Sequence, residues 1–252
     1  MRGPEQRISN FALGAFGFAV CLGLWEYVGV KQLAGLTLPP LSTVLSFTFS
    51  PERQGLLQRA VMATVSSVAI GYVIGIVLGC ILSMVAHVLS KLRPGLDQLV
   101  AMIHVIPRIS LAPVLLVFLA RDDVGAAISA AGVFTVTYVA VQSGLQSSTQ
   151  AHRDLMRALG ARPLGMLRLI EIPAALPALA TAARLAVPVA FIGAIIGEWF
   201  GASRGIGVVM ISAMQNFQIP LLWSTVLLSA GLSMIFYGLF ALLERYVQER
   251  LT

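Results

Sequence analysis

The segment "AHRDLMRALGARPLGMLRLIEIP" (Ala151–Pro173) interrupts an otherwise very apolar chain with charges, glycines and prolines. Five arginine or aspartate side chains fall between Arg153 and Arg168, so this segment is too polar to cross a bilayer. Leu155 and Leu159 recur at helical spacing, and Gly160 is a residue that ends helices. The pattern predicts a short amphipathic helix that ends near Leu159 and lies beside the membrane.

A second short helix is expected directly after this glycine. Pro163 suits a first helical turn, and Leu164, Leu167 and Ile170 recur at helical spacing. Pro173 is then expected to turn the chain back into the membrane. Two interpretations remain open at this point. Basic amphipathic helices can rest on anionic lipid headgroups, and they can also fit into a groove of a cytoplasmic partner protein.

The rest of the chain has the composition of a membrane protein. Of its 252 residues, 58% are hydrophobic and 11% charged, against about a quarter charged in soluble domains. Four runs without Asp, Glu, Lys or Arg reach the roughly 18 to 20 residues that a span needs: Ile8–Trp25, Val61–Ala86, Val124–Ala151 and Gly205–Leu243. Two weaker spans carry isolated charges: Leu99–Ala120 and Leu176–Phe200. The sequence therefore predicts an all-α membrane protein with six transmembrane helices in one domain, residues 1–252.

Two polar segments outside these spans are expected to lie at the surface. Asn216–Pro220 is predicted to be a short re-entrant or external segment, followed by a final helix from about Leu221 to Leu243. Lys31–Gln58 is predicted to be external, with a short helix whose N-cap is Ser42.

The second span carries a stripe of small residues. Gly71, Gly75, Gly79 and Ser83 follow one another at four-residue spacing, so they share one helix face and allow another backbone to approach closely. The stripe could be a seam between two chains, but such stripes are common within membrane bundles. Packing within one chain is the favoured interpretation.

The third span, Leu99–Ala120, contains two prolines and one charge. Pro107 and Pro113 each remove a helical hydrogen bond, and irregular backbone at membrane depth is tolerated where it is buried or lines a cavity. Arg108 would cost about 2.5 to 3.5 kcal/mol facing lipid. In a continuous helix, His104 and Arg108 would share one face. We expect both to point inward and to line a passage.

The fifth span holds two further ionisable residues, each with two interpretations. Glu198 is either a structural carboxylate, bonded to the glycine-rich turn at Gly201–Gly207 or paired with Arg204, or a gate or docking residue. Arg184 either reaches the cytoplasmic surface with its long side chain or faces the passage.

The positive charges indicate an orientation. With a cytoplasmic amino terminus, ten basic residues lie inside: Arg2, Arg7, Lys91, Arg93, Arg153, Arg157, Arg162, Arg168, Arg245 and Arg250. Five lie outside: Lys31, Arg53, Arg59, Arg121 and Arg204. The positive-inside rule then places both termini in the cytoplasm. The net charge of +6 is spread over loops and forms no soluble basic face, so no nucleic-acid partner is expected.

Catalytic and metal-binding patterns are not recognisable in the sequence. His87, His104 and His152 are scattered, and no nucleophile with a base or carboxylate pair is recognisable. Cys21 and Cys80 lie within apolar spans and are expected to be packing residues.

The opening segment resembles the Glu-Ala-Ala loop of permease subunits of binding-protein-dependent ABC importers. Asp154-Leu155-Met156 is followed by three residues, Gly160, nine residues and Ile170-Glu171-Ile172-Pro173, without gaps. Further positions are similar to the sulfonate, taurine and nitrate branch of that family: Pro177, Arg184, Glu198, Gly201, Gly205, Gly207, Leu38–Val44 and Ile106–Pro113. Two features depart from it. Asp-Leu-Met replaces Glu-Ala-Ala, and His104 and Arg108 stand where the family usually has Arg and Pro.

The resemblance implies a type I importer permease fold in the bacterial inner membrane, with a cytoplasmic coupling helix within about residues 151–173. The residues implied to contact an ATPase are Asp154, Leu155, Arg157, Leu159, Gly160, Ala161, Leu164, Ile170 and Pro173. Those implied for the pore or substrate are His104, Arg108, Arg184 and Glu198. The implied partners are a pair of ATP-binding subunits, a periplasmic or lipid-anchored substrate-binding protein, and a second permease subunit, expected to be an identical copy.

No cofactor is expected on this chain. It lacks the G-x-x-x-x-G-K-[ST] phosphate loop, so ATP and magnesium would be bound by the partner ATPase. A stand-alone secondary transporter or channel is the alternative, disfavoured because inverted halves are not recognisable. A membrane-embedded enzyme would need clustered polar residues at one depth. Sulfonates, nitrate-like anions, a pyrimidine vitamin precursor and aromatic acids all remain open as substrates.

Overall fold

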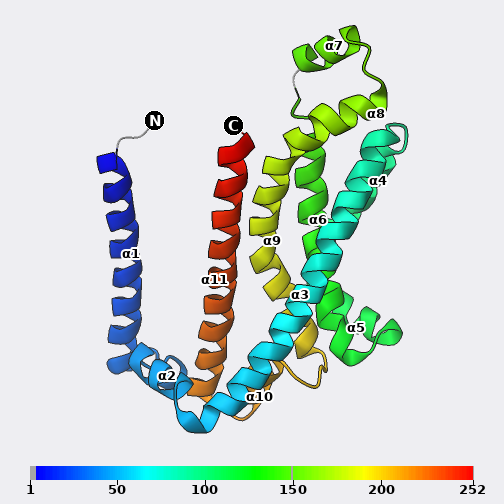
Figure 1. The fold of residues 1–252 in the computed structure, drawn as a ribbon. Helices are drawn as coiled ribbons and strands as arrows, with labels where there is room; N and C mark the ends of the chain where they lie inside the picture. Colours follow the sequence, from blue (N-terminus) through cyan, green and yellow to red (C-terminus); the bar gives the residue numbers. More distant parts are fainter. Residues whose placement is uncertain (1–3, 149, 252) are drawn as a thin grey trace. The chain divides into compact units, whose positions relative to one another are not determined.

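All regular secondary structure in the residues that the computed structural model describes is helical (Figure 1). These are residues 4–148 and 150–251, with side chains described for all of them except 4–12, 150, 152, 153, 157, 163 and 251. They fall into two compact units, residues 1–58 with 209–227 and residues 59–208 with 228–252. Three helices continue from one unit into the other, and the expectation of one permease domain stays a prediction.

Five described helices are long and apolar enough to cross a membrane. They are α1 (Pro4–Val30), α3 (Pro51–Val88), α6 (Val124–Leu145), α9 (Ile172–Trp199) and α11 (Ile219–Leu251). The bent pair α4 (Arg93–Val105) and α5 (Arg108–Phe118) brings the number to six when counted as one span. The prediction of an all-α membrane protein is confirmed, with five or six candidate spans.

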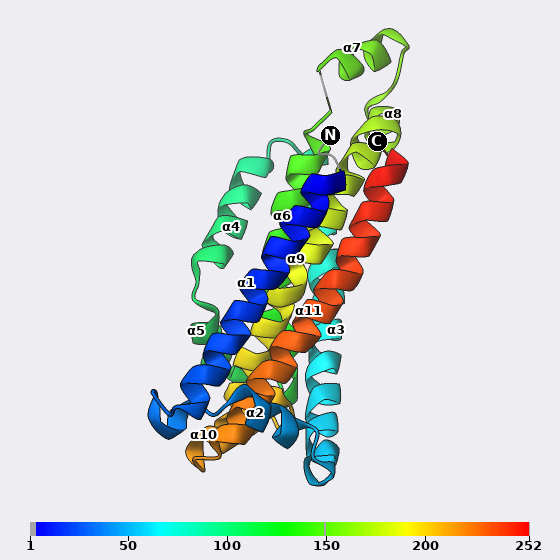
Figure 2. The same cartoon turned by 90° about the vertical axis from the view of Figure 1, so that its left-hand side faces the viewer.

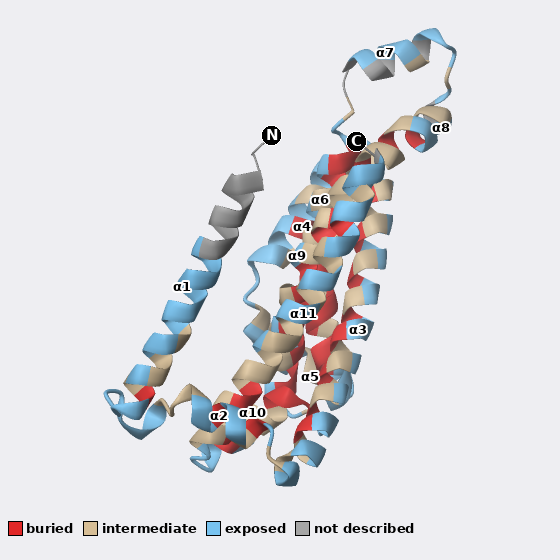
Figure 3. Cartoon of the chain, turned by 60° about the vertical axis from the view of Figure 1, so that its left-hand side comes forward, coloured by how far each residue is buried: buried red, intermediate tan, exposed pale blue. Residues whose placement is uncertain are grey.

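The core of the larger unit is the packing of α6 against α9. A Cβ atom added to Gly193 would lie 2.6 Å from the Cα of Ser129, and one added to Gly125 would lie 3.0 Å from the carbonyl oxygen of Ala194. The two backbones therefore touch, which only small residues allow. Figure 3 shows the buried residues concentrated along these two helices.

The small-residue stripe of α3 packs on α6 within the same chain, as favoured from the sequence (Figure 2). Added Cβ atoms at the three glycines would each lie 2.6 to 2.7 Å from a side-chain Cβ of α6: Gly71 from Ser129, Gly75 from Val133, and Gly79 from Thr137. Ser83 completes the stripe, since its hydroxyl donates to the carbonyl of Tyr138 at 3.0 Å. The stripe needs no second chain to explain it.

The third span is not the single helix predicted over Leu99–Ala120. The chain bends by 99° between α4 and α5. Ile106 and Pro107 have extended backbone, with ψ of 122° and 120°. Proline lacks an N–H and disfavours helical geometry in the residue before it, so Pro107 ends α4. Pro113 lies inside α5 without ending it.

The helix is not interrupted at Pro173, the residue expected to turn the chain back into the membrane. The short helix α8 (Pro163–Met166) continues through a π-helical turn, η3 (Leu167–Glu171), into α9. In this turn the N–H of Ile172 donates to the carbonyl of Leu167, five residues back. The changed hydrogen-bond register accommodates a proline, which has no N–H to donate. One helical stretch therefore runs from Leu164 to Trp199.

The last part of the chain matches its prediction in outline. The helix α10 (Ile206–Gln215) ends before the polar segment at Asn216, and α11 begins at Ile219. The final helix does not stop near Leu243, because it continues to Leu251. Glu244 lies in this extension, within the larger unit.

The smaller unit is held by contacts around two tryptophans and one carboxylate. It contains α1, a 3-10 turn η1 (Gly35–Thr37), α2 (Leu41–Thr48) and the start of α11. Trp25 and Trp223 pack with ring centroids 5.0 Å apart. Ser42 is not the N-cap of α2: its N–H and hydroxyl donate to Glu26, at 3.0 and 2.7 Å. The carboxylate of Glu26 therefore caps this helix in place of a serine oxygen.

Candidate functional site

The segment between α6 and α9 forms two short helices joined at a glycine. We call residues 150–171 the α7–α8 segment; it consists of α7 (Gln150–Ala158), α8 and η3. Gly160 has a φ of +76°, and the N–H of Ala161 donates to the carbonyl of Met156 at 2.9 Å. This is a glycine C-cap of the Schellman type. The predicted helix–glycine–helix arrangement is confirmed, with α7 ending at Ala158.

Large apolar side chains on this segment are exposed to the surroundings. The exposed fractions are 58% for Leu155, 72% for Leu159, 57% for Leu164 and 68% for Leu169. Clustered exposed apolar side chains mark an interaction surface. The described residues of this chain leave these leucines uncovered and available for contact with a lipid surface or another protein.

The other residues predicted for this site are spread over the segment and its joint with α9. Asp154 and Gly160 are exposed, Ala161 and Ile170 are half-buried, and Pro173 is half-buried within α9. The side chain of Arg157 lies outside the described ones. Whether these residues contact an ATPase stays a prediction.

The joint between the α7–α8 segment and α9 is buried. Leu167 is 9% exposed and belongs to a cluster with Val141 and Leu145 of α6. Glu171 lies 2.8 Å from His87 of α3, measured from Oε2 to Nε2. One end of the segment is thus anchored in the bundle.

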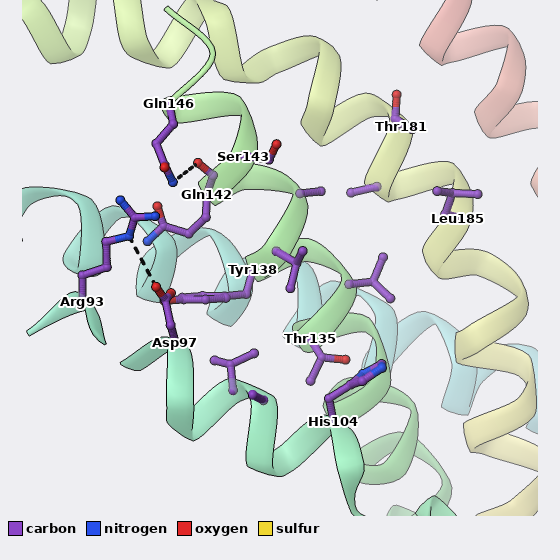
Figure 4. A pocket seen from close by; sticks show the side chains of 16 residues that line it. Arg93, Asp97, His104, Thr135, Tyr138, Gln142, Ser143, Gln146, Thr181 and Leu185 are labelled. Carbon is purple, nitrogen blue, oxygen red and sulfur yellow. Dashed lines mark hydrogen bonds and ion pairs between the residues drawn. The ribbon is translucent and has the colours of Figure 1, made fainter. Parts of the chain in front are cut away.

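A groove of about 950 Å³ lies between α4, α6 and α9 (Figure 4). Polar side chains occupy one end of it. Arg93 and Asp97 of α4 approach to 3.4 Å, and the hydroxyl of Tyr138 donates to Asp97 at 2.6 Å. The side chain of Gln142 is buried beside them. The sequence offered no signal for this cluster, because its members come from different helices.

Arg108 and His104 lie on different helices, so the prediction of one shared helix face is wrong. The guanidinium of Arg108 lies against α6, where its Cζ would be 2.9 Å from a Cβ added to Gly132. His104 lines the groove together with Thr135, one turn further along α6. The bend at Pro107 therefore brings both basic side chains against one part of α6. Arg108 is half-buried, and no described carboxylate forms an ion pair with it.

Arg184 is partly buried and forms an ion pair with a buried acid that was not predicted from the sequence. Its guanidinium lies 2.9 Å from Glu244 of α11 and also over the ring of Tyr237 at 5.2 Å. The hydroxyl of Thr181 donates to the same carboxylate at 2.6 Å. The signal was available, since Glu244 is the first acid after a long uncharged run.

Glu198 holds the turn that precedes α10, which confirms its structural interpretation. Its carboxylate is 3% exposed and accepts hydrogen bonds from the hydroxyl of Thr64 and the N–H of Gly207, both at 2.7 Å. A Cβ at Gly205, whose φ is +143°, would collide with this carboxylate. Pairing with Arg204 is not found among the described residues. Whether Glu198 or Arg184 meets a substrate stays a prediction.

Comparison with known proteins identifies the family. Residues 71–249 match the family described as binding-protein-dependent transport system inner membrane component. The chain belongs to this family. It is therefore a multi-pass inner-membrane transport component and not an enzyme, and membership implies a partner ATPase and a substrate-binding protein.

The relatives support the same assignment without naming one substrate. A probable ABC transporter permease protein of Haemophilus influenzae is 30% identical over 195 residues, which are 76% of this chain and 79% of the relative. The putative aliphatic sulfonates transport permease protein SsuC of Bacillus subtilis is 24% identical over 248 residues, which are 96% of this chain and 88% of the relative. The predicted sulfonate branch is therefore only partly supported.

A solved structure confirms the fold. An inward-facing structure of the MetNI methionine ABC transporter aligns with a TM-score of 0.69 at 22% identity, over 79% of this chain and 99% of that chain. At this identity the likeness concerns the fold alone. The prediction of a type I importer permease fold is confirmed.

Proposed function

We propose that this chain is the permease subunit of an ATP-driven importer, and that its α7–α8 segment is the part gripped by the ATPase. The observation that carries this proposal is the exposed leucines on two short helices hinged at Gly160. Such a surface suits helix-in-groove binding, in which apolar side chains of a short helix fill a hydrophobic cleft. Membership of the family implies an ATPase partner, which could provide such a cleft.

The continuity of α9 with the α7–α8 segment supports a mechanical role. From Leu164 to Trp199 the chain is one helical stretch, so a displacement of α8 is passed directly to α9. Closure of the ATPase pair on ATP would move the segment and, with it, the helices that border the groove. This is a rigid-body switch between inward- and outward-facing states.

The groove between α4, α6 and α9 is proposed to be one wall of the passage, closed by a second copy of this chain. Its open side and its volume of about 950 Å³ support this role. Arg108 lies against Gly132 of α6, one turn before the groove residue Thr135, without an acid partner among the described residues, which favours a small anionic or polar organic cargo. The sulfonate relative is consistent with an anion.

The charge distribution supports a cytoplasmic α7–α8 segment. In the larger unit, the start of α4, the α7–α8 segment and the end of α11 lie at the same end (Figure 1). These elements and the turn before α4 carry Lys91, Arg93, Arg162, Arg168, Arg245 and Arg250. The positive-inside rule places this end, and the carboxyl terminus, in the cytoplasm.

The test is ATP hydrolysis by the reconstituted transporter in the presence of its substrate-binding protein. Leu159→Asp places a charge in the proposed contact, and Gly160→Pro cannot adopt the φ of +76° that the hinge requires. Both are expected to fold and to lose stimulated hydrolysis, whereas Leu159→Met keeps it. Normal stimulation in Leu159→Asp would contradict the proposal.

A further inference from the structure

The joint that anchors the α7–α8 segment contains a charged contact that the packing of the bundle does not require. Glu171, the last residue of the π-helical turn, is 8% exposed, and its Oε2 lies 2.8 Å from Nε2 of His87. This distance is that of a hydrogen bond between the imidazole and the carboxyl group. The side chain of His87 is 17% exposed. Both groups are therefore largely removed from water and satisfy one another.

Apolar contacts already hold this joint in place. Leu167, in the first position of the turn, packs in a cluster with Val141, Leu145 and Ala175, to which Met84 of α3 also contributes. A buried charged contact is weak evidence for stability, because desolvating the two groups offsets much of their attraction. Such a contact does fix direction, since hydrogen bonds depend on geometry in a way that apolar packing does not.

The His87–Glu171 contact connects the ends of two membrane-spanning helices. His87 is in the last turn of α3, the helix whose Gly71–Ser83 stripe lies along α6. Glu171 lies between α8 and α9, in a π-helical turn, and such turns occur frequently at functional sites. The contact therefore links the moving end of α9 to the end of a second spanning helix.

We propose that His87 and Glu171 are positioning residues that pass the displacement of the α7–α8 segment to α3 as well as to α9. This inference rests on the proposed coupling function. When the ATPase moves the segment, the directional contact makes the end of α3 follow the joint. Without it, the apolar contacts alone connect the joint to α3, so the end of α3 follows less closely and ATP is hydrolysed with less opening of the passage. The sequence contained Glu171 within the motif Ile170–Pro173, but it gave no sign of His87 as its partner.

The experiment compares solute imported per ATP hydrolysed in proteoliposomes that contain the complete transporter and its binding protein. The double variant His87→Leu/Glu171→Leu replaces the charged contact by apolar side chains and preserves burial. The exchanged variant His87→Glu/Glu171→His restores the contact with its ends reversed. Glu52→Gln, an exposed acid at the opposite end of α3, is the matched control.

The double leucine variant is expected to assemble and to hydrolyse ATP while solute imported per ATP falls about tenfold, the effect of losing one charge-assisted hydrogen bond. The exchanged variant is expected to recover most of the ratio, and the control to keep it. An unchanged ratio in the leucine variant would overturn the inference, because the pair would then only fill space. A ratio that the exchanged variant does not restore would overturn it equally. If the unaltered transporter shows no ATP-dependent import, the proposed function itself fails.

Discussion

Apolar side chains are buried between α6 and α9 but exposed on the α7–α8 segment that connects these two helices. On α9, four alanines at four-residue spacing are fully buried at 0% exposure: Ala182, Ala186, Ala190 and Ala194. On the connecting segment, four leucines are exposed by 57% to 72%: Leu155, Leu159, Leu164 and Leu169. Small residues allow the two helices to bury one another within the chain, whereas these four large side chains are left uncovered by the described residues. The α6–α9 pair packs within its own chain, whereas the exposed leucines of the α7–α8 segment suit contact with a partner surface.

The largest effect is expected where the two backbones touch. Gly193→Leu would force a side chain into the backbone of Ser129, because even a Cβ would lie 2.6 Å from its Cα. Overpacking of this kind costs about 3 kcal/mol or more. Gly231→Leu on α11 is the control, since no heavy atom lies within 4 Å of its added Cβ. Thermal unfolding in detergent should show a large fall in midpoint for the first variant and little change for the second. Equal midpoints would contradict the assigned packing.

A smaller loss is expected for the charged contact between α9 and α11. Glu244→Leu leaves the partly buried guanidinium of Arg184 without its acid, which costs about 1 to 3 kcal/mol. The double variant Arg184→Leu/Glu244→Leu removes both charges and should recover most of the stability. Unfolding midpoints of the two variants distinguish this outcome from one in which the pair contributes nothing, where both would match the original protein.

Arg108 tests whether the groove carries cargo. Arg108→Ala should lower the initial rate of uptake about tenfold, the effect of losing a hydrogen bond to a charged group, without reducing the yield of assembled transporter. Arg108→Lys should keep part of the rate, because it preserves the charge but not the planar fork. Uptake of labelled solute into proteoliposomes measures both. A normal rate in the alanine variant would show that this guanidinium does not meet the cargo.

The smallest effect is expected at the hinge of the α7–α8 segment. Gly160→Ala keeps the turn but strains it by about 1 kcal/mol, since φ is +76° there. Stimulated ATP hydrolysis should fall partially. Gly165→Ala in α8 is the matched control: it has no positive φ and open space around its added Cβ, so it should not reduce hydrolysis. Equal activities in the two variants would mean that the hinge geometry is unimportant.

The fold was largely predictable because its signals are local and strong. Uncharged runs located the long spans, the four-residue spacing from Gly71 located a close helix contact, and Gly160 marked a helix end. Each of these patterns acts through length, size or backbone freedom, which a single segment determines by itself.

The features that were missed depend on three-dimensional context. Pro107 and Pro173 look alike in sequence, yet Pro107 ends a helix and Pro173 is accommodated by a π-helical turn. The partner of Arg184 lies 60 positions further along the chain, and that of Glu171 lies 84 positions earlier. Helix spacing within one segment cannot reveal such partners. The candidate site was therefore predicted in its position but not in its contacts.

The most direct test of the central claim is the accessibility of a single cysteine at position 159. With Cys21→Ser and Cys80→Ala as background, Leu159→Cys is treated with a membrane-impermeant thiol reagent in intact spheroplasts and in inside-out vesicles. The account predicts labelling only in inside-out vesicles stripped of the ATPase, and protection when the purified ATPase is added back. Labelling from the outside of intact cells, or labelling that the ATPase leaves unchanged, would contradict it.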